Sequence, residues 1–166
     1  MQIYIASPLG FSETGRAFYY GTLIPQIESL GHGVLDPWKL SDQQKMDLVL
    51  TMPSGPEKRD EWRRLNAEIG RNNQRAIDRC DAVFAVLDGS DIDSGTASEI
   101  GYAFAKGKPI LGYRGDFRLS ADNEGSIVNL QVEYFIRQSG GEIITRFADL
   151  ASALTKIVTI AGQRSD

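Results

Sequence analysis

The sequence is poor in the residues on which many protein chemistries depend. It contains one cysteine, Cys80, and one histidine, His32, among 166 residues. A single cysteine excludes an intrachain disulfide and any metal site built from several thiolates. A single histidine, set between Gly31 and Gly33 in an expected turn, argues against a histidine-based zinc site and against a Ser-His-Asp triad. We therefore expect the chain to use neither a metal nor a cofactor.

Positive charge and long apolar runs are also scarce. The chain has 18 Lys and Arg residues against 22 Asp and Glu residues, for a net charge of −4. This balance gives no general attraction to nucleic acid or to anionic membranes. No run approaches the roughly 18 apolar residues of a membrane span, and the first residues resemble a strand instead of a signal peptide. We expect a cytoplasmic protein that binds neither nucleic acid nor a membrane.

Segments typical of strands and of helices alternate along the chain. Five segments have the apolar or β-branched composition of strands: 2–7, 33–38, 81–89, 108–114 and 141–147. Six have helical spacing of apolar residues: 16–30, 43–50, 57–79, 96–106, 126–139 and 148–160. The third of these is either one long helix or two helices broken near Gly70. The alternation predicts one α/β domain over residues 1–166, a flavodoxin-like or Rossmann-like sandwich with a mostly parallel five-stranded sheet.

Ligands bind such sheets at the carboxyl ends of the strands, so loops 7–15 and 88–96 are expected on one functional rim. The first loop has the glycine spacing of a P-loop, from Gly10 to Gly15. Arg16 and Ala17 stand where that motif needs a lysine and a serine or threonine. A nucleoside triphosphatase is therefore not expected.

The second loop leads into Thr96-Ala97-Ser98-Glu99, which allows two interpretations. As a capping box, Thr96 is the N-cap and Glu99 reaches back to the backbone. As a site, the first helical turn holds the Glu99 carboxylate in its ionised form and makes it a nucleophile. Asp93 and the side-chain-free Gly95 precede it. A carboxylate nucleophile without a metal or a useful histidine is typical of glycosyl transfer.

This stretch, Asp88-Gly89 followed by Asp93-x-Gly95-Thr96-x-x-Glu99-x-Gly101-x-Ala103, resembles the signature of the nucleoside 2-deoxyribosyltransferase family. Three further segments resemble that family in the same order along the chain: IYIASPLGF (3–11), NQRAIDRCDAV (73–83) and Asn129-Leu130. The resemblance implies an enzyme that exchanges the base of a 2′-deoxynucleoside for a free purine or pyrimidine base. A covalent 2-deoxyribosyl-glutamate is the intermediate, with no cofactor.

The resemblance also implies a role for individual residues. Glu99 is the nucleophile, Asp93 a polar partner that assists protonation of the base, and Tyr4 a hydrogen-bond donor to the nucleophile. The implied substrate-binding residues are Ser7, Gly10, Phe11, Asn73, Asp88, Gly95, Asn129 and Gln131. Asn129 is lent by a neighbouring subunit to bind the sugar 5′-hydroxyl, so a homo-oligomer, either a dimer or an assembly of dimers, is expected.

Two positions depart from the family pattern. Asn73 stands where many members have an aspartate that contacts the base, and Gln131 stands where some have methionine. An asparagine can hydrogen-bond a base but cannot act as a general acid at neutral pH. Either Asp93 or water must then protonate the departing base.

Three other interpretations remain open. A related hydrolase would release the base from a 2′-deoxynucleoside 5′-monophosphate, with water as the acceptor. The phosphoribohydrolase family shares G-T-x-x-E, but Asp93-Ser94-Gly95 stands in place of its Pro-Gly-Gly. In a non-catalytic nucleotide-binding module, Glu99 would be only a helix cap.

Overall fold

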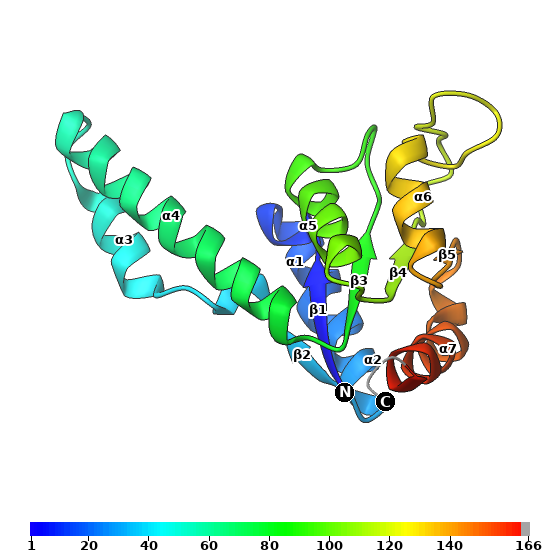
Figure 1. The fold of residues 1–166 in the computed structure, drawn as a ribbon. Helices are drawn as coiled ribbons and strands as arrows, with labels where there is room; N and C mark the ends of the chain where they lie inside the picture. The colour runs from blue at the N-terminus through cyan, green and yellow to red at the C-terminus, as the bar shows by residue number, and fades with distance from the viewer. Residues whose placement is uncertain (164–166) are drawn as a thin grey trace.

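The computed structural model describes residues 1–163 and shows a central sheet with helices packed on both of its faces (Figure 1). The strands are β1 (Gln2–Ala6), β2 (Gly33–Leu35), β3 (Ala82–Val86), β4 (Ile110–Tyr113) and β5 (Ile143–Ile144). Their order is β2-β1-β3-β4-β5, and every pairing is parallel. The predicted five-stranded α/β fold is confirmed, and the sheet is entirely parallel. Strand order reverses between β1 and β3, where ligands of such sheets bind.

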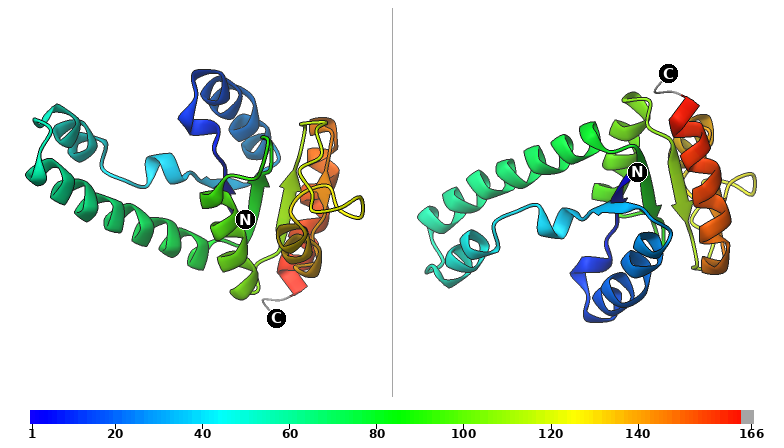
Figure 2. Two further views of the ribbon diagram at one scale, coloured as in Figure 1. Left: turned by 90° about the horizontal axis from the view of Figure 1, so that it is seen from above. Right: turned by 90° about the horizontal axis from the view of Figure 1, so that it is seen from below.

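The helices divide between two layers. They are α1 (Glu13–Phe18), α2 (Ile24–Ser29), α3 (Gln43–Thr51), α4 (Pro56–Arg79), α5 (Ser94–Ala105), α6 (Leu130–Gln138) and α7 (Leu150–Gln163). One face of the sheet packs against α2 and α7, and the other packs against the end of α4, α5 and α6 (Figure 2). The predicted helix 16–30 is one continuous helical segment. A π-helical turn, Tyr19–Leu23, joins α1 to α2 within it.

The sheet separates two hydrophobic cores because successive side chains of a strand point to opposite faces. In β1, Ile3 and Ile5 enter the core under α2 and α7, whereas Tyr4 and Ala6 enter the core under α5. Tyr4 is fully buried in this second layer. A buried tyrosine hydroxyl needs a hydrogen-bond partner, and the sequence supplies one in α5.

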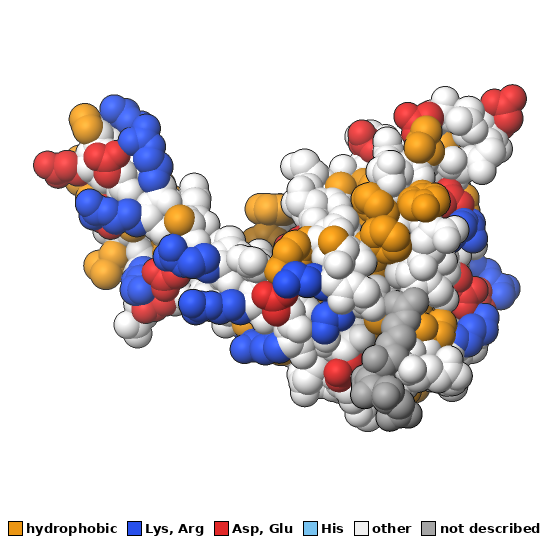
Figure 3. All heavy atoms as spheres, viewed as in Figure 1, with side chains coloured by type: hydrophobic (Ala, Val, Ile, Leu, Met, Phe, Trp, Pro, Cys, Tyr) orange, Lys and Arg blue, Asp and Glu red, His pale blue; other side chains and the backbone are white. Residues whose placement is uncertain are grey.

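An arm made of α3 and the first part of α4 projects from the body of the molecule (Figures 1 and 2). Charged side chains cover much of it (Figure 3). α4 is a single helix of 24 residues that runs through Gly70. A glycine within an exposed helix costs only about 1 kcal/mol, so it need not end the helix. No helix within residues 1–163 is both long and apolar enough to cross a membrane.

All five strands are shorter than their sequence patterns, and β2 and β5 lose the largest share. The expected strand 33–38 ends at Leu35, because the Asp36 side chain caps a 3₁₀ turn over Pro37–Lys39. The expected strand 141–147 pairs only over Ile143–Ile144 at the edge of the sheet.

Candidate active site

A cavity of about 360 Å³ opens at the carboxyl ends of β1 and β2, beside the first turns of α5. Its walls come from both predicted loops and from the inner face of α4. The lining residues are Ser7, Phe11, Pro37, Trp38, Asn66, Ile69, Asn73, Asp93, Gly95, Thr96 and Glu99. The volume is in the range of small-molecule sites, and the position adjoins the point where strand order reverses. The two loops do share one rim, as the sequence predicts.

Glu99 is fixed within this cavity by two donors from other elements. The Tyr4 hydroxyl of β1 donates to Glu99 Oε1 at 2.6 Å, and Asn73 Nδ2 of α4 donates to the same oxygen at 3.4 Å. Glu99 Oε2 has no hydrogen-bond partner among residues 1–163 and is available to a ligand. A carboxylate with one oxygen held and the other open is prepared to act on a bound molecule.

The helix cap differs from the sequence prediction. The N-cap of α5 is Asp93, whose Oδ2 accepts from the Thr96 N–H at 2.9 Å and lies 3.3 Å from the Thr96 hydroxyl. Thr96 is therefore the third helical residue, and Glu99 lies in the second turn. Of the two interpretations of this stretch, the capping box is therefore wrong, because Asp93 occupies the N-cap position that it gives to Thr96. Glu99 is free of any capping role.

Contrary to what is expected of a carboxylate in the first turn, the helix also does not stabilise the ionised form of Glu99. Burial raises the pKa of Glu99 to about 7, and the nearby Asp93 carboxylate adds to the rise, while the Tyr4 hydrogen bond opposes it. Glu99 is too far along α5 to gain from the free N–H groups of the first turn. Burial, followed by the charge of Glu99, raises the pKa of Tyr4 far above its ordinary value. Tyr4 therefore remains a donor at neutral pH.

The structure gathers most of the predicted residues but leaves five of them outside the cavity lining: Tyr4, which reaches the site only through its bond to Glu99, Gly10, Asp88, Asn129 and Gln131. Gly10 packs under Trp38, where an added Cβ would lie 2.1 Å from the indole ring. Asp88 accepts from the Asp116 N–H at 2.9 Å. Asn129 caps α6, accepting from the Gln131 N–H at 3.0 Å. In this protomer, therefore, neither Asn129 nor Gln131 lines the cavity.

Four lining residues were not singled out from the sequence: Pro37, Trp38, Asn66 and Ile69. Asn66, Ile69 and Asn73 recur at helical spacing, which was a usable signal for one face of α4. Pro37 and Trp38 follow the end of β2 after one residue, Asp36, and so they lie at the same edge of the sheet as Ser7. Phe11 and Trp38 meet edge to face, with ring centroids 4.7 Å apart.

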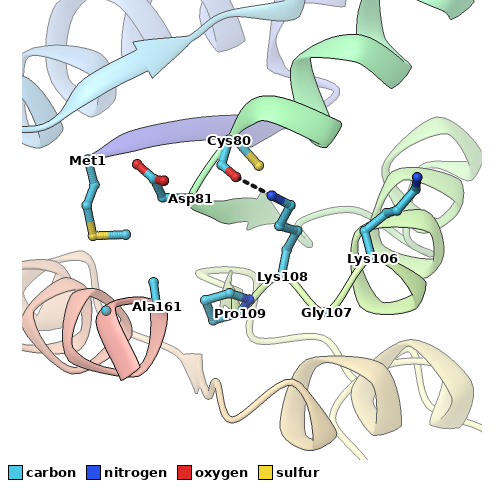
Figure 4. A pocket seen from close by; sticks show the side chains of 9 residues that line it. Met1, Cys80, Asp81, Lys106, Gly107, Lys108, Pro109 and Ala161 are labelled. Atoms are coloured by element: carbon cyan, nitrogen blue, oxygen red, sulfur yellow. Dashed lines mark hydrogen bonds between the residues drawn. The ribbon is translucent and has the colours of Figure 1, made fainter. Parts of the chain in front are cut away.

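A second hollow, of about 270 Å³, lies at the opposite edge of the sheet, where the strands begin (Figure 4). Lys108 Nζ donates there to the Cys80 carbonyl at 2.6 Å. Cys80 is 1% exposed, and burial raises the pKa of its thiol to about 11, as fits a residue that packs in the core. None of the predicted site residues lines this hollow. In the described part of the chain, no three His, Cys, Asp or Glu side chains are grouped to hold a metal.

Solved structures resemble the fold over nearly the whole chain. A conserved protein from Enterococcus faecalis V583 is 24% identical, with a TM-score of 0.67, over 94% of this chain and 98% of its own. A 2-desoxiribosyltransferase from Leishmania mexicana is 25% identical, with a TM-score of 0.62, over 95% and 97% of the two chains. The Clostridium botulinum CMP N-glycosidase BcmB is 20% identical, with a TM-score of 0.52, over 93% and 98%.

An uncharacterised protein of Schizosaccharomyces pombe is 28% identical over 135 residues. The match covers 58% of this chain and 64% of that protein, so this chain spans less than two thirds of its length. The family model for nucleoside 2-deoxyribosyltransferases matches residues 3–131, which include the Tyr4–Glu99 pair and every residue of the cavity lining. The chain belongs to the nucleoside 2-deoxyribosyltransferase family.

Proposed function

We propose that this protein exchanges the base of 2′-deoxynucleosides through a covalent 2-deoxyribosyl intermediate on Glu99. The observation that carries the proposal is the state of Glu99. It lies in a nucleoside-sized cavity, Tyr4 holds Oε1 at 2.6 Å, and Oε2 is open. Family membership supports an activity on nucleosides.

The chemistry has two halves. Glu99 Oε2 attacks the anomeric carbon as its bond to the base breaks through an oxocarbenium-like transition state, which gives a glycosyl ester and a free base. A second base then attacks the same carbon, the ester bond breaks, and Glu99 leaves as a carboxylate. Tyr4 keeps Oε1 oriented throughout and stabilises the returning charge by its hydrogen bond.

The departing base needs a proton, and Asp93 is the other carboxyl group in the cavity lining. Asn73 cannot supply one, since an amide is no acid at neutral pH. We infer that Asp93, or a water that it holds, delivers this proton. Asp93 Oδ2 is engaged by Thr96, so Oδ1 is the oxygen that can take part.

The charge of the cavity favours a neutral substrate. Within the described chain, its lining contains Asp93 and Glu99 but no lysine or arginine. A 5′-phosphate would bring close to two further negative charges. Arg16 follows the 7–15 loop in α1, and its Nη1 already donates to the Gly10 carbonyl at 3.1 Å. The ribose 2′-hydroxyl disfavours the oxocarbenium-like state by withdrawing electrons, so a deoxy sugar is the easier substrate.

The sugar 5′-hydroxyl is proposed to meet Asn129 of a second subunit. Asn129 stands at the start of α6, next to an exposed apolar surface on α5 and α6 (Figure 3). On that surface Leu130 is 50% exposed and Tyr134 53% exposed, and Phe104 stacks on Phe135. An apolar patch of this kind favours contact with another protein, here a second copy of the chain.

Hydrolysis is the second candidate, with water in place of the second base. The likeness in fold to the CMP N-glycosidase from C. botulinum favours it. The same Glu99 chemistry would serve both reactions, so the acceptor and the 5′ group distinguish them.

The test compares deoxyadenosine, adenosine and deoxyadenosine monophosphate, each with and without a second base. We expect deoxyadenosine to react fastest and the added base to appear in a new deoxynucleoside. Fastest cleavage of the monophosphate to 2-deoxyribose 5-phosphate and free adenine, with no new deoxynucleotide from the added base, would establish the hydrolase instead.

A further inference from the structure

Asp36 is a buried acidic residue directly behind the cavity wall. It follows β2 at the carboxyl edge of the sheet and is 6% exposed. Its Oδ1 accepts from the Tyr19 hydroxyl at 2.9 Å and from the Trp38 backbone N–H at 3.1 Å. The second bond caps the turn Pro37–Lys39, whose first two residues line the cavity. Asp36 thus joins a helix on one face of the sheet to a wall of the candidate site.

Tyr19 reaches Asp36 from the first position of the π-helical turn. Such turns insert an extra residue into a helix and occur frequently at functional sites. Burial, followed by the charge of Asp36, raises the pKa of Tyr19 far above its ordinary value, and the same two causes raise the pKa of Tyr20 to about 12. Tyr19 therefore stays protonated at neutral pH and remains a donor to Asp36.

Trp38 is held at both ends. Asp36 fixes its backbone, and its ring lies against Gly10 and meets Phe11 edge to face. The indole Nε1 is buried and has no hydrogen-bond partner within residues 1–163. An indole N–H can only donate, and a buried donor without an acceptor is costly. Trp38 lines the cavity with its ring, whereas its buried Nε1 is closed to the cavity, so the contacts with Asp36 and Gly10 hold the ring in the wall against this cost.

We propose that Asp36 is a positioning residue for substrate binding, which places the Trp38 ring as a wall of the cavity against the base. The inference rests on the proposed function, because the base of a nucleoside is the ligand it names. Bases present a flat face for an aromatic side chain. Asp36 does not touch the reacting atoms, and Glu99 and Tyr4 belong to other elements. Its loss is therefore expected to weaken binding more than the chemical step.

The test uses Trp38 as its own reporter. The chain has two tryptophans, so Trp62→Phe leaves Trp38 as the only indole. In a Trp62→Phe, Glu99→Gln background, turnover is blocked and deoxyadenosine can be titrated at equilibrium by the change in Trp38 emission. The variants described next, made in a Trp62→Phe protein that keeps Glu99, give KM and kcat.

Four variants separate positioning from general stability. Asp36→Ala removes the acceptor, Asp36→Asn keeps one acceptor oxygen, and Tyr19→Phe removes one donor. The matched control is Asp42→Ala, since Asp42 caps α3 with the same kind of bond, 3.0 Å from the Gln44 N–H, and does not line the cavity.

We expect Asp36→Ala to raise the Kd and the KM by about tenfold, with a much smaller change in kcat, and to make Trp38 more accessible to iodide. Asp36→Asn should restore binding to within about threefold, and Asp42→Ala should leave it unchanged. Circular dichroism monitors folding. If Asp36→Ala does not fold, Tyr19→Phe decides, with an expected rise in Kd of a few-fold.

The outcomes are distinct. Binding by the parent protein together with an unchanged Kd in Asp36→Ala or Tyr19→Phe overturns the positioning role and leaves the proposed function intact. An equal loss of binding in Asp42→Ala also overturns the positioning role, because the loss of any helix cap would then be enough to weaken binding. Failure of the parent to bind deoxyadenosine, with no turnover in the Glu99 protein, overturns the proposed function and this inference together.

Discussion

At the scale of single residues, Glu99 sits among groups that shift its pKa in opposite directions. Burial and the Asp93 charge raise that pKa, whereas the Tyr4 hydrogen bond lowers it. With the pKa of Glu99 at about 7, only about half of the free protein carries the nucleophilic carboxylate at neutral pH. The kcat/KM for deoxynucleoside should therefore fall as the pH drops through about 7.

Two substitutions should move this fall in kcat/KM at low pH, the acid limb of the pH profile, in opposite directions. Tyr4→Phe removes the hydrogen bond that favours the ionised form, so the limb should move to higher pH by roughly one unit. Asp93→Asn removes a neighbouring charge and keeps a good N-cap, so the limb should move to lower pH by a fraction of a unit. The measurement is the pH profile of kcat/KM, normalised for each variant. Shifts in the same direction would contradict the assigned causes.

Glu99 should also limit stability. Its folded pKa of about 7 lies above its ordinary value of 4.5, so the folded state favours the protonated form. The stabilising contribution of that proton is full below about pH 4.5 and is lost as the pH rises through about 7. Glu99→Gln should therefore raise the free energy of unfolding by roughly 1–3 kcal/mol at pH 8, and by much less at pH 5.

Glu133 provides a control of opposite sign. Burial alone would raise the pKa of Glu133, but hydrogen bonds from the Ile127 N–H and from Arg137 outweigh it and hold that pKa below its usual value. Glu133→Gln should lower stability at pH 8. The check is urea unfolding of both variants at the two pH values; a destabilised Glu99→Gln protein at pH 8 would contradict the proposed burial cost.

At the scale of elements, α4 carries a glycine that its structure does not need. A Cβ at Gly70 would meet no heavy atom within 4 Å, and the residue lies within the helix. Gly70→Ala should stabilise the protein by about 0.5–1 kcal/mol and leave base exchange unchanged. Gly10→Ala is the contrasting variant, because its Cβ would collide with Trp38. Gly10→Ala should weaken nucleoside binding. Thermal unfolding and KM measurements distinguish the two variants. A destabilised Gly70→Ala protein would contradict the claim that α4 does not need this glycine.

The sequence predicts some features of these elements and not others, for physical reasons. The buried run of β3 and the helical spacing of α4 are local signals, and both elements are present. The T-x-x-E pattern favours Thr96 as the cap of α5, whereas Asp93 is the cap, because both residues are good N-caps and only the path of the preceding loop decides between them. The ionisation of Glu99 depends on burial under other elements, which no local pattern contains. Trp38 and Asn66 lie in segments that adjoin the arm. Tertiary packing decides where those segments lie against the sheet, so no local pattern predicts their place in the cavity.

At the scale of the whole molecule, the proposed substrate site needs a second subunit. Asn129 does not line the cavity of its own protomer and stands beside an exposed apolar surface. Inactive Glu99→Ala mixed with weak Asn129→Ala should regain activity once the subunits exchange. A hybrid dimer then contains one cavity with its own Glu99 and the partner's native asparagine. No recovery in a mixture shown by mass spectrometry to contain hybrids would exclude the shared site.

The central claim is a reversible glycosyl bond to Glu99, and the most direct test is exchange of labelled adenine into unlabelled deoxyadenosine. No second nucleoside is present, so label can enter only if the base departs and another attacks the retained sugar. The wild-type protein should label deoxyadenosine faster than it releases free deoxyribose, and Glu99→Gln should do neither. Free sugar without labelled nucleoside, or exchange that persists in Glu99→Gln, would contradict the account.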